Sequence, residues 1–190
     1  MYNDYPMKME ANGKIYPINT DYRIALACLQ ALDDETISDL ERFYAVESLL
    51  LGTDVLAEDE LILKEKIANY LRCGRTENTS SEEIDMDYFQ DRKLIRTSIQ
   101  QVYHGLDVSE IEHLHWYKYN ELIEGLTEDS ILERTRQLRT YDTSNISDEK
   151  EVQRIENAKA KVALKKKQIQ LTNEQLESTY KFYELTGIRR

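Results

Sequence analysis

The feature that most restricts the fold of this chain is the position of its prolines. Pro6 and Pro17 are the two prolines among 190 residues, so the last 173 positions contain none. Because a proline inside a helix removes a backbone hydrogen bond and clashes with the preceding turn, that long stretch is free of the strongest helix breaker. Five of the six glycines stand at or just past the end of a stretch of helical periodicity, as helix C-termini favour. These are Gly52, Gly74, Gly105, Gly125 and Gly187. The pattern predicts an all-α fold.

The sixth glycine indicates a different local structure. Gly13 follows Asn12, and an Asn-Gly pair is a strong signal for a two-residue hairpin turn because both residues tolerate positive φ. The pair stands between residues 7–10 and 14–16, which are short enough to form two strands. We therefore expect a small N-terminal β-hairpin as the only sheet.

Apolar residues at helical spacing predict three helices in the first part of the chain. The first begins after a cap at Asn19 or Thr20, and only Gln30 is polar in its last nine residues. A helix that is apolar almost all round belongs at the centre of the fold. The second helix follows Asp34, and the third covers about residues 57–72.

A polar stretch without periodicity at residues 75–83 predicts a loop, after which three more helices follow. Their expected starts are Asp87, Ser109 and a capping cluster between Thr127 and Ser130. With the final segment, the fold is predicted to be a compact bundle of six to seven helices.

The final segment differs from the rest in its pattern of apolar residues. A helix should start near Ser147, but its apolar stripe is thin and is interrupted by Lys159 and Lys166. A narrow stripe buries little, so such a helix depends on a partner surface or remains an exposed arm. We divide the chain into a helical body, residues 1–144, and a helical C-terminal arm, residues 145–190.

Charge is divided unevenly between body and arm. The arm has seven acidic and ten basic residues, a net charge of +3, which leaves the body with 29 acidic and 15 basic residues, a net charge of −14. Affinity for nucleic acid depends on cation contacts to phosphates, so the body is poorly suited to it and we expect no nucleic-acid partner. We also expect no membrane partner, because no apolar run approaches ~18 residues and the N-terminus lacks a targeting signal.

Residue patterns typical of catalysis or metal binding were sought and not found. His113 and His115 would lie about 200° apart around a helix, so they cannot share a metal. The acids in residues 85–91 resemble the start of a calcium loop, but its sixth position is Gln90 and its twelfth is Arg96. Phosphate-binding loops, nucleophile elbows and Cys–His pairs are missing too. We expect no enzyme activity, no cofactor and no metal.

The densest group of aromatic residues has two interpretations. Trp116, Tyr117 and Tyr119, together with Tyr88 and Tyr103, could form a platform for a partner, because aromatic residues are favoured at interfaces. The interpretation we favour is a helix–helix core.

Six segments in a fixed order resemble a known protein family. They are Tyr16-Pro17-Ile18-Asn19-Thr20-Asp21-Tyr22-Arg23, Asp87-Tyr88-Phe89-Gln90-Asp91, Tyr103-His104-Gly105-Leu106-Asp107, Leu114-His115-Trp116-Tyr117-Lys118-Tyr119, Gly125-Leu126-Thr127-Glu128-Asp129 and Arg139-Thr140-Tyr141-Asp142. Over roughly residues 14–142 the chain resembles the "gp fifteen" family of small proteins from long-tailed bacteriophages, taken to be tail-assembly chaperones encoded beside the tape-measure protein.

The resemblance implies a function without chemistry. Such a chaperone would bind and solubilise the tape-measure protein in the host bacterial cytoplasm until tail-tube subunits polymerise, with the tail-tube protein as a further partner. It would be a homo-oligomer and be absent from the mature virion. We expect the arm to make the partner contacts. The predicted contact residues are Lys159, Lys165, Lys166, Ile169, Leu176, Tyr180 and Tyr183.

Two alternatives remain open at this point. A structural virion protein, such as a tail-completion or connector piece, would have the same sequence features. A helical DNA-binding regulator would use the lysine-rich arm as its nucleic-acid contact, although the acidic body argues against it.

Overall fold

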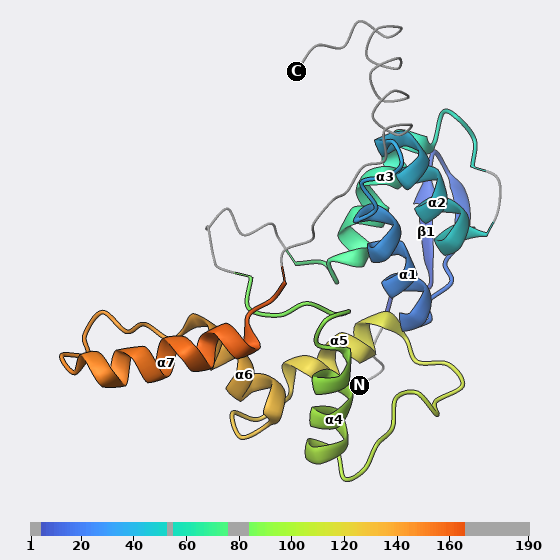
Figure 1. Cartoon of the computed structure of the whole chain (residues 1–190). Coiled ribbons are helices and arrows are strands. Elements are labelled where there is room, and N and C mark those ends of the chain that lie inside the picture. The colour runs from blue at the N-terminus through green and yellow to red at the C-terminus, as the bar shows by residue number, and fades with distance from the viewer. Residues whose placement is uncertain (1–4, 53–54, 76–83, 166–190) are drawn as a thin grey trace, which may run out of the picture.

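The computed structural model describes residues 5–52, 55–75 and 84–165. Within these ranges the chain forms seven helices and one two-stranded antiparallel sheet, so the predicted all-α fold with a small N-terminal hairpin is confirmed (Figure 1). In chain order the elements are β1 (Lys8–Ala11), β2 (Lys14–Pro17), α1 (Tyr22–Leu32), α2 (Asp39–Leu51), α3 (Glu60–Leu71), α4 (Arg92–Val102), α5 (Trp116–Glu124), α6 (Ile131–Thr140) and α7 (Glu149–Val162).

The hairpin forms around the predicted Asn-Gly turn. Asn12 and Gly13 have φ angles of 48° and 80°, the left-handed values that this two-residue turn requires. One face of the hairpin is buried through Met9 and Tyr16, whereas Ile15 on the other face is exposed. This alternation follows from the two-residue period of a strand and places one face on the helices.

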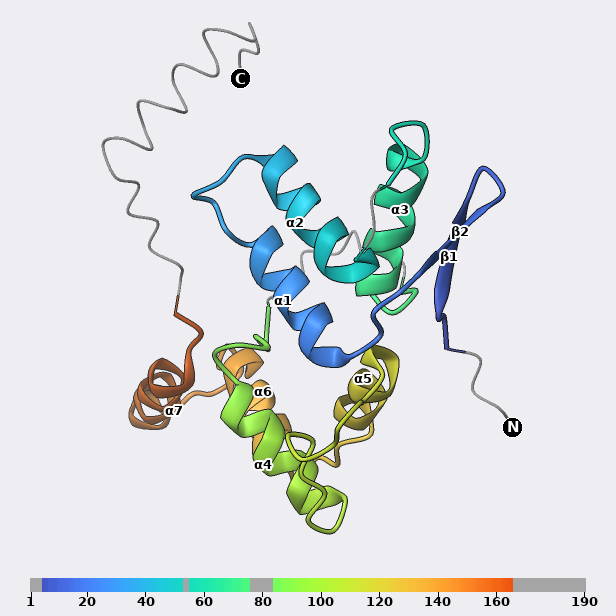
Figure 2. The ribbon, with the colours of Figure 1, turned by 90° about the vertical axis from the view of Figure 1, so that its right-hand side faces the viewer.

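The hairpin packs on α3, and a buried carboxylate joins the two. Asp59, just before α3, accepts a 2.5 Å hydrogen bond from the Tyr16 hydroxyl and a 2.7 Å bond from the Asn12 side-chain amide. Helices α1 and α2 lie side by side in the same half of the molecule (Figure 2). Helix α1 also contacts α5 in the other half, and so occupies the central position that its apolar sequence predicted.

The predicted cap of α1 at Asn19 or Thr20 is wrong. The cap is Asp21, whose carboxylate accepts the Arg23 N–H at 2.8 Å. Asn19 donates its N–H to the Leu50 carbonyl, and Thr20 accepts the N–H of a residue in the second half of the chain. Both are therefore held in extended backbone by distant partners, and the helix begins later.

The predicted start of the fifth helix at Ser109 is also wrong. Helix α5 begins at Trp116, because Leu114 accepts the N–H of Tyr22 and Trp116 donates its own N–H to Thr20, both at 2.8 Å. The segment before α5 thus forms an isolated antiparallel bridge with the start of α1. Ser109 instead closes a turn by donating to Asp107.

The prediction that Asp87 caps α4 is wrong. Helix α4 begins at Arg92, with Asp91 in the N-cap position. The carboxylate of Asp87 accepts the N–H groups of Phe89 and Gln90, so it caps the turn that precedes the helix. The predicted cap at Ser130 is confirmed, since its hydroxyl accepts the Glu133 N–H.

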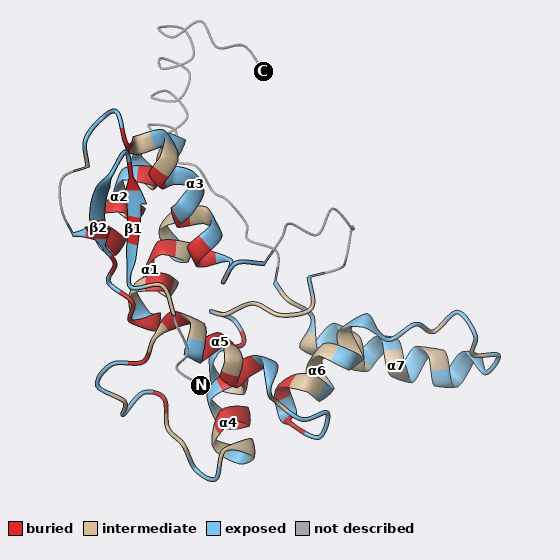
Figure 3. Cartoon of the chain, turned by 180° about the vertical axis from the view of Figure 1, so that it is seen from behind, coloured by how far each residue is buried: buried red, intermediate tan, exposed pale blue. Residues whose placement is uncertain are grey.

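Helix α6 packs on α4, and α7 extends away from the rest of the described chain (Figure 1). Buried residues concentrate on α1 to α5 and the hairpin, while α7 has no buried residue (Figure 3). As predicted for the final segment, α7 starts within the Ser-Asp-Glu cluster: Asp148 caps it by accepting the Lys150 N–H. Most of the loop predicted at 75–83 lies outside the described residues.

Candidate partner-binding arm and the groove at its base

The structure describes two of the seven predicted contact residues. Lys159 lies on α7 and Lys165 stands three residues beyond its last turn. The other five predicted contacts lie outside the described residues. They are Lys166, Ile169, Leu176, Tyr180 and Tyr183. The site can therefore be built from α7 and from the surface that meets its C-terminal end.

Helix α7 packs on α6 through the thin stripe that the sequence predicted. Val152, Ile155, Ala158 and Val162 are half-buried along this stripe. No residue of α7 is fully covered, so its packing on α6 leaves apolar surface accessible. Helix α7 is the described part of the arm, and its apolar stripe has room for further contacts.

One arginine fixes the C-terminal end of α7 to the body. Arg139, near the end of α6, donates its Nε–H to the carbonyl of Val162 at 2.6 Å. Its other nitrogens bond the Asp91 carboxylate twice and the Asp85 carbonyl once, each at 2.7 Å. A carbonyl in the last turn of a helix has no partner within the helix, so Arg139 supplies a donor where one is needed.

A second contact holds the chain just after α7. The Gln90 side-chain amide donates to the Lys165 carbonyl at 3.1 Å and accepts the Lys165 N–H at 2.8 Å. Lys159 adds a 2.9 Å bond from its ammonium to the Tyr141 carbonyl. The two Gln90 bonds hold main-chain atoms of the arm, whereas the third contact uses the side chain of Lys159.

A groove of about 790 Å³ opens where the arm meets the body. Asp33 from the end of α1, Ile84 before α4 and Leu164 after α7 line it. The side chain of Ile84 is 81% exposed, which is unusual for isoleucine. A smaller neighbouring hollow of about 510 Å³ adds Phe89. The two hollows share Asp33, Asp87, Gln90 and Lys165 in their linings.

The charges around this groove are mixed. Its lining contains the acids Asp33, Asp87 and Glu156 and the bases Arg139, Lys159 and Lys165. Such a surface suits an amphipathic helix, whose apolar side chains would contact Ile84 and whose polar flank would meet the rim.

The aromatic cluster is part of the core, as the favoured interpretation predicted. Trp116 and Tyr119 are buried, and the Trp116 indole N–H donates to the Leu71 carbonyl at 3.1 Å. The ring of Tyr119 stacks on Tyr22 with centroids 4.4 Å apart, and burial raises its pKa. Tyr88 and Tyr117 are half-buried at the edge of this core.

The histidines have structural roles in the described region. His115 is the N-cap of α5, because its Nδ1 accepts the Tyr117 N–H at 3.1 Å. Burial lowers the pKa of its imidazole, which favours the neutral form. His113 lies 3.0 Å from the Thr20 hydroxyl. Among the described residues no three His, Cys, Asp or Glu side chains come together as metal ligands. Cys28 is buried, which raises the pKa of its thiol to about 12.

The segments that carry the family resemblance meet in space as three pairs. Asp87–Asp91 meets Arg139–Asp142 at the base of the arm through the Asp91–Arg139 ion pair. Residues 16–23 meet 114–119 through the bridge before α5. Residues 103–107 meet 125–129 through Tyr103, whose hydroxyl donates to the Leu122 carbonyl. The same hydroxyl lies so close to Gly125 that a Cβ added there would collide with it.

Comparison with known proteins agrees with this reading of the segments. The model of the family described as "Bacteriophage Gp15 protein" matches residues 2–164. The chain belongs to the bacteriophage Gp15 family. Against curated proteins and solved structures there was no significant match.

The family match ends at the groove that we describe. Its last matched residue, Leu164, lines the groove at the base of the arm. Within the described part of this Gp15 protein, no helix combines the length and apolarity needed to cross a membrane. The sequence predicted Lys159 and Lys165 as partner contacts, which stays a prediction, and it did not indicate that Gln90 and Arg139 hold the arm. Their presence in two of the quoted family segments was the signal that could have identified them.

Proposed function

We propose that this Gp15 protein is a non-enzymatic tail-assembly chaperone that binds and solubilises the tape-measure protein before the tail tube polymerises. The observation that carries the proposal is the projecting helix α7, fixed by Arg139 and Gln90 beside a groove with the exposed Ile84. A long helical protein with apolar stripes aggregates until those stripes are covered. The groove and the α7 stripe offer apolar surface of the form that such helices need.

Net charge supports the same function. The chain carries a net charge of −11, so many copies along one polypeptide would keep the complex soluble through mutual repulsion. The proposal places this step in the cytoplasm of the infected bacterium. It also implies contact with the tail-tube protein during hand-over, self-association of copies through the arm, and absence from the finished virion.

The experiment is co-expression with the tape-measure protein encoded beside it, followed by affinity purification and light scattering. We expect the long protein to be soluble only in the complex, with many copies of this chain bound. A protein that stays alone while the long one aggregates would contradict the proposal. Recovery of this chain in purified particles would instead favour a structural virion component.

Two matched substitutions locate the binding surface. Ile84 in the groove and Leu61 on α3 are each 81% exposed, so a change to aspartate costs either of them little folding energy. We expect Ile84→Asp to reduce co-purification at least tenfold and Leu61→Asp to leave it unchanged. Equal effects of the two variants would remove the groove from the proposal. Deletion of residues 145–190 without effect on oligomeric state and partner binding would remove the arm.

A further inference from the structure

Within the described residues, the outer edge of β1 presents main-chain groups that β2 does not pair. Ala11 and Lys14 flank the two-residue turn, and Ile18 donates its N–H to the Met7 carbonyl at 3.0 Å. Antiparallel strands alternate between hydrogen-bonded and non-bonded pairs, so the residues between these bonded pairs direct their N–H and C=O groups outward. On β1 these residues are Lys8 and Glu10.

This edge faces a groove of about 630 Å³ between β1 and α3. Met9, Ile18 and Ile62 contribute apolar surface along it. On the α3 side the lining runs from Ile62 to Tyr70, about 12 Å along the helix axis at ~1.5 Å per residue. That length matches about four residues of extended chain at ~3.3 Å each.

One contact within the groove shows how the edge can be used. The Lys66 ammonium donates to the Glu10 carbonyl, one of the outward groups. A cation on a flexible stem thus occupies the position that the N–H of a neighbouring strand would take. The opposite edge, on β2, is less suited to pairing because Pro17 has no N–H to donate.

Aromatic rings line one end of the groove. Tyr70 and Tyr117 stack with centroids 5.4 Å apart and lie beside Pro6. Behind them His115 stacks on Tyr5 at 4.7 Å. Tyr70 is buried and supports the half-buried Tyr117, whose ring forms a preformed apolar surface against which a large apolar or aromatic side chain can pack.

We propose that the β1 edge and α3 bind an extended, uncharged segment of a partner polypeptide, which adds a third strand and packs an apolar side chain against Tyr117. The groove carries Lys8 and Lys66 but also Glu10 and Glu65. A strongly charged segment of either sign would therefore meet a like charge, which is why the proposal specifies an uncharged one. Main-chain hydrogen bonds provide affinity in this mode, and the apolar pocket provides selectivity.

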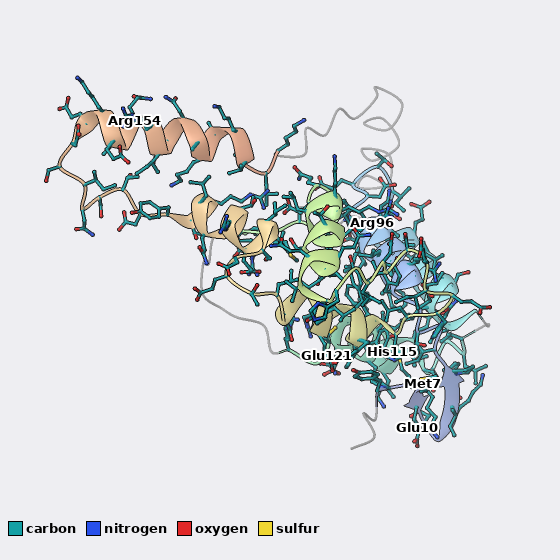
Figure 4. The ribbon with its side chains drawn as sticks, turned by 90° about the horizontal axis from the view of Figure 1, so that it is seen from below. Met7, Glu10, Arg96, His115, Glu121 and Arg154 are labelled. Carbon is teal, nitrogen blue, oxygen red and sulfur yellow. The ribbon has the colours of Figure 1, made fainter. Side chains whose placement is uncertain are left out.

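This surface is separate from the arm. Glu10 on the hairpin and Arg154 on α7 lie at opposite ends of the molecule (Figure 4). The proposal therefore goes beyond the proposed function, and each can fail while the other holds.

The test uses two proline substitutions at cross-strand partners. Glu10 and Ile15 face each other in the register, and both direct their N–H outward, so proline at either position leaves the hairpin's own bonds in place. The probe is a displayed library of random twelve-residue peptides selected on the full chain, with enriched peptides then synthesised. We expect Glu10→Pro to weaken their binding at least tenfold and Ile15→Pro less than twofold.

Further measurements keep the test independent of folding. If circular dichroism shows that Glu10→Pro is unfolded, Ile62→Arg replaces it, with the exposed neighbour Leu61→Arg as control; the first should abolish binding and the second should not. N-methylation at alternate peptide positions should also abolish binding. The proposal is overturned if no peptide is enriched, if binding ignores the groove variants, or if peptides bind only after residues 166–190 are deleted.

Discussion

Arg139 forms a bidentate ion pair with Asp91, 48 residues away in the sequence, with both N–O distances at 2.7 Å. The two side chains are 10% and 2% exposed. Arg139 lies near the end of α6 and Asp91 at the N-cap of α4, and the same guanidinium bonds the last carbonyl of α7 at Val162. One side chain therefore joins the packing of the body to the placement of the arm.

Arg139→Met should destabilise the protein by about 3–5 kcal/mol, because it leaves the Asp91 carboxylate buried without a counter-charge. Urea unfolding followed by circular dichroism measures this change. Adding Asp91→Leu should recover much of the loss, since two apolar side chains remove the uncompensated charge. Arg134→Met on the same helix is the control. Arg134 is exposed and its ion pair with Asp129 is long, at 3.9 Å, so its loss should cost under ~1 kcal/mol. Equal costs for the two arginines would contradict the assignment.

Tyr16→Phe should reduce the free energy of unfolding by about 1.5–3 kcal/mol. The Tyr16 hydroxyl donates to the Asp59 carboxylate, which is 1% exposed, and a hydrogen bond to a buried charged group is among the stronger ones. The same urea titration measures the loss, with Tyr44→Phe on the exposed side of α2 as the matched control. A Tyr16→Phe variant as stable as Tyr44→Phe would show that the hairpin does not depend on this bond.

The elements predicted correctly are those specified by neighbouring residues. The Asn12-Gly13 turn and the cap at Ser130 need only residues within three or four positions, so the sequence pattern contains them. The start at Ser109 failed because the backbone around Leu114 pairs with residues more than 90 positions earlier. Helical periodicity contains no information about such distant strand-like pairing.

The site was partly predictable for the same reason. A lysine-rich helix beside a thin apolar stripe predicted Lys159 and Lys165 as partner contacts, and in the structure they bond Tyr141 and Gln90 of the same chain. The contacts that hold the arm join Gln90 to Lys165 and Arg139 to Val162, across 75 and 23 residues. Polar residues in a helical sequence do not reveal which distant carbonyl they will bond, so these two were visible only as parts of the quoted family segments.

Tyr70→Phe should leave stability unchanged or raise it by about 1 kcal/mol. The Tyr70 hydroxyl is buried and has no hydrogen-bond partner in the described part of the protein, so the substitution removes an unsatisfied polar group without opening a large cavity. Burial also raises the pKa of this hydroxyl. Thermal unfolding of Tyr70→Phe beside Tyr16→Phe is the direct comparison. A clear loss for Tyr70→Phe would mean that its hydroxyl does bond a group.

Asp107 should give the protein a stability contribution that depends on pH. Its carboxylate accepts the Ser109 N–H at 2.9 Å and the Ser109 hydroxyl at 2.6 Å, and it pairs with Arg96. Together these contacts lower its pKa from 3.8 to about 2. Between those values the unfolded chain binds more protons than the folded one, so stability rises with pH across this window and the contribution is complete above about pH 4.

Chemical unfolding of Asp107→Asn and the unchanged protein at pH 2, 3, 4 and 5 should show a difference that is largest at pH 5 and shrinks toward pH 2. A difference that stays constant across the series would mean that the ionised carboxylate is not what stabilises this turn.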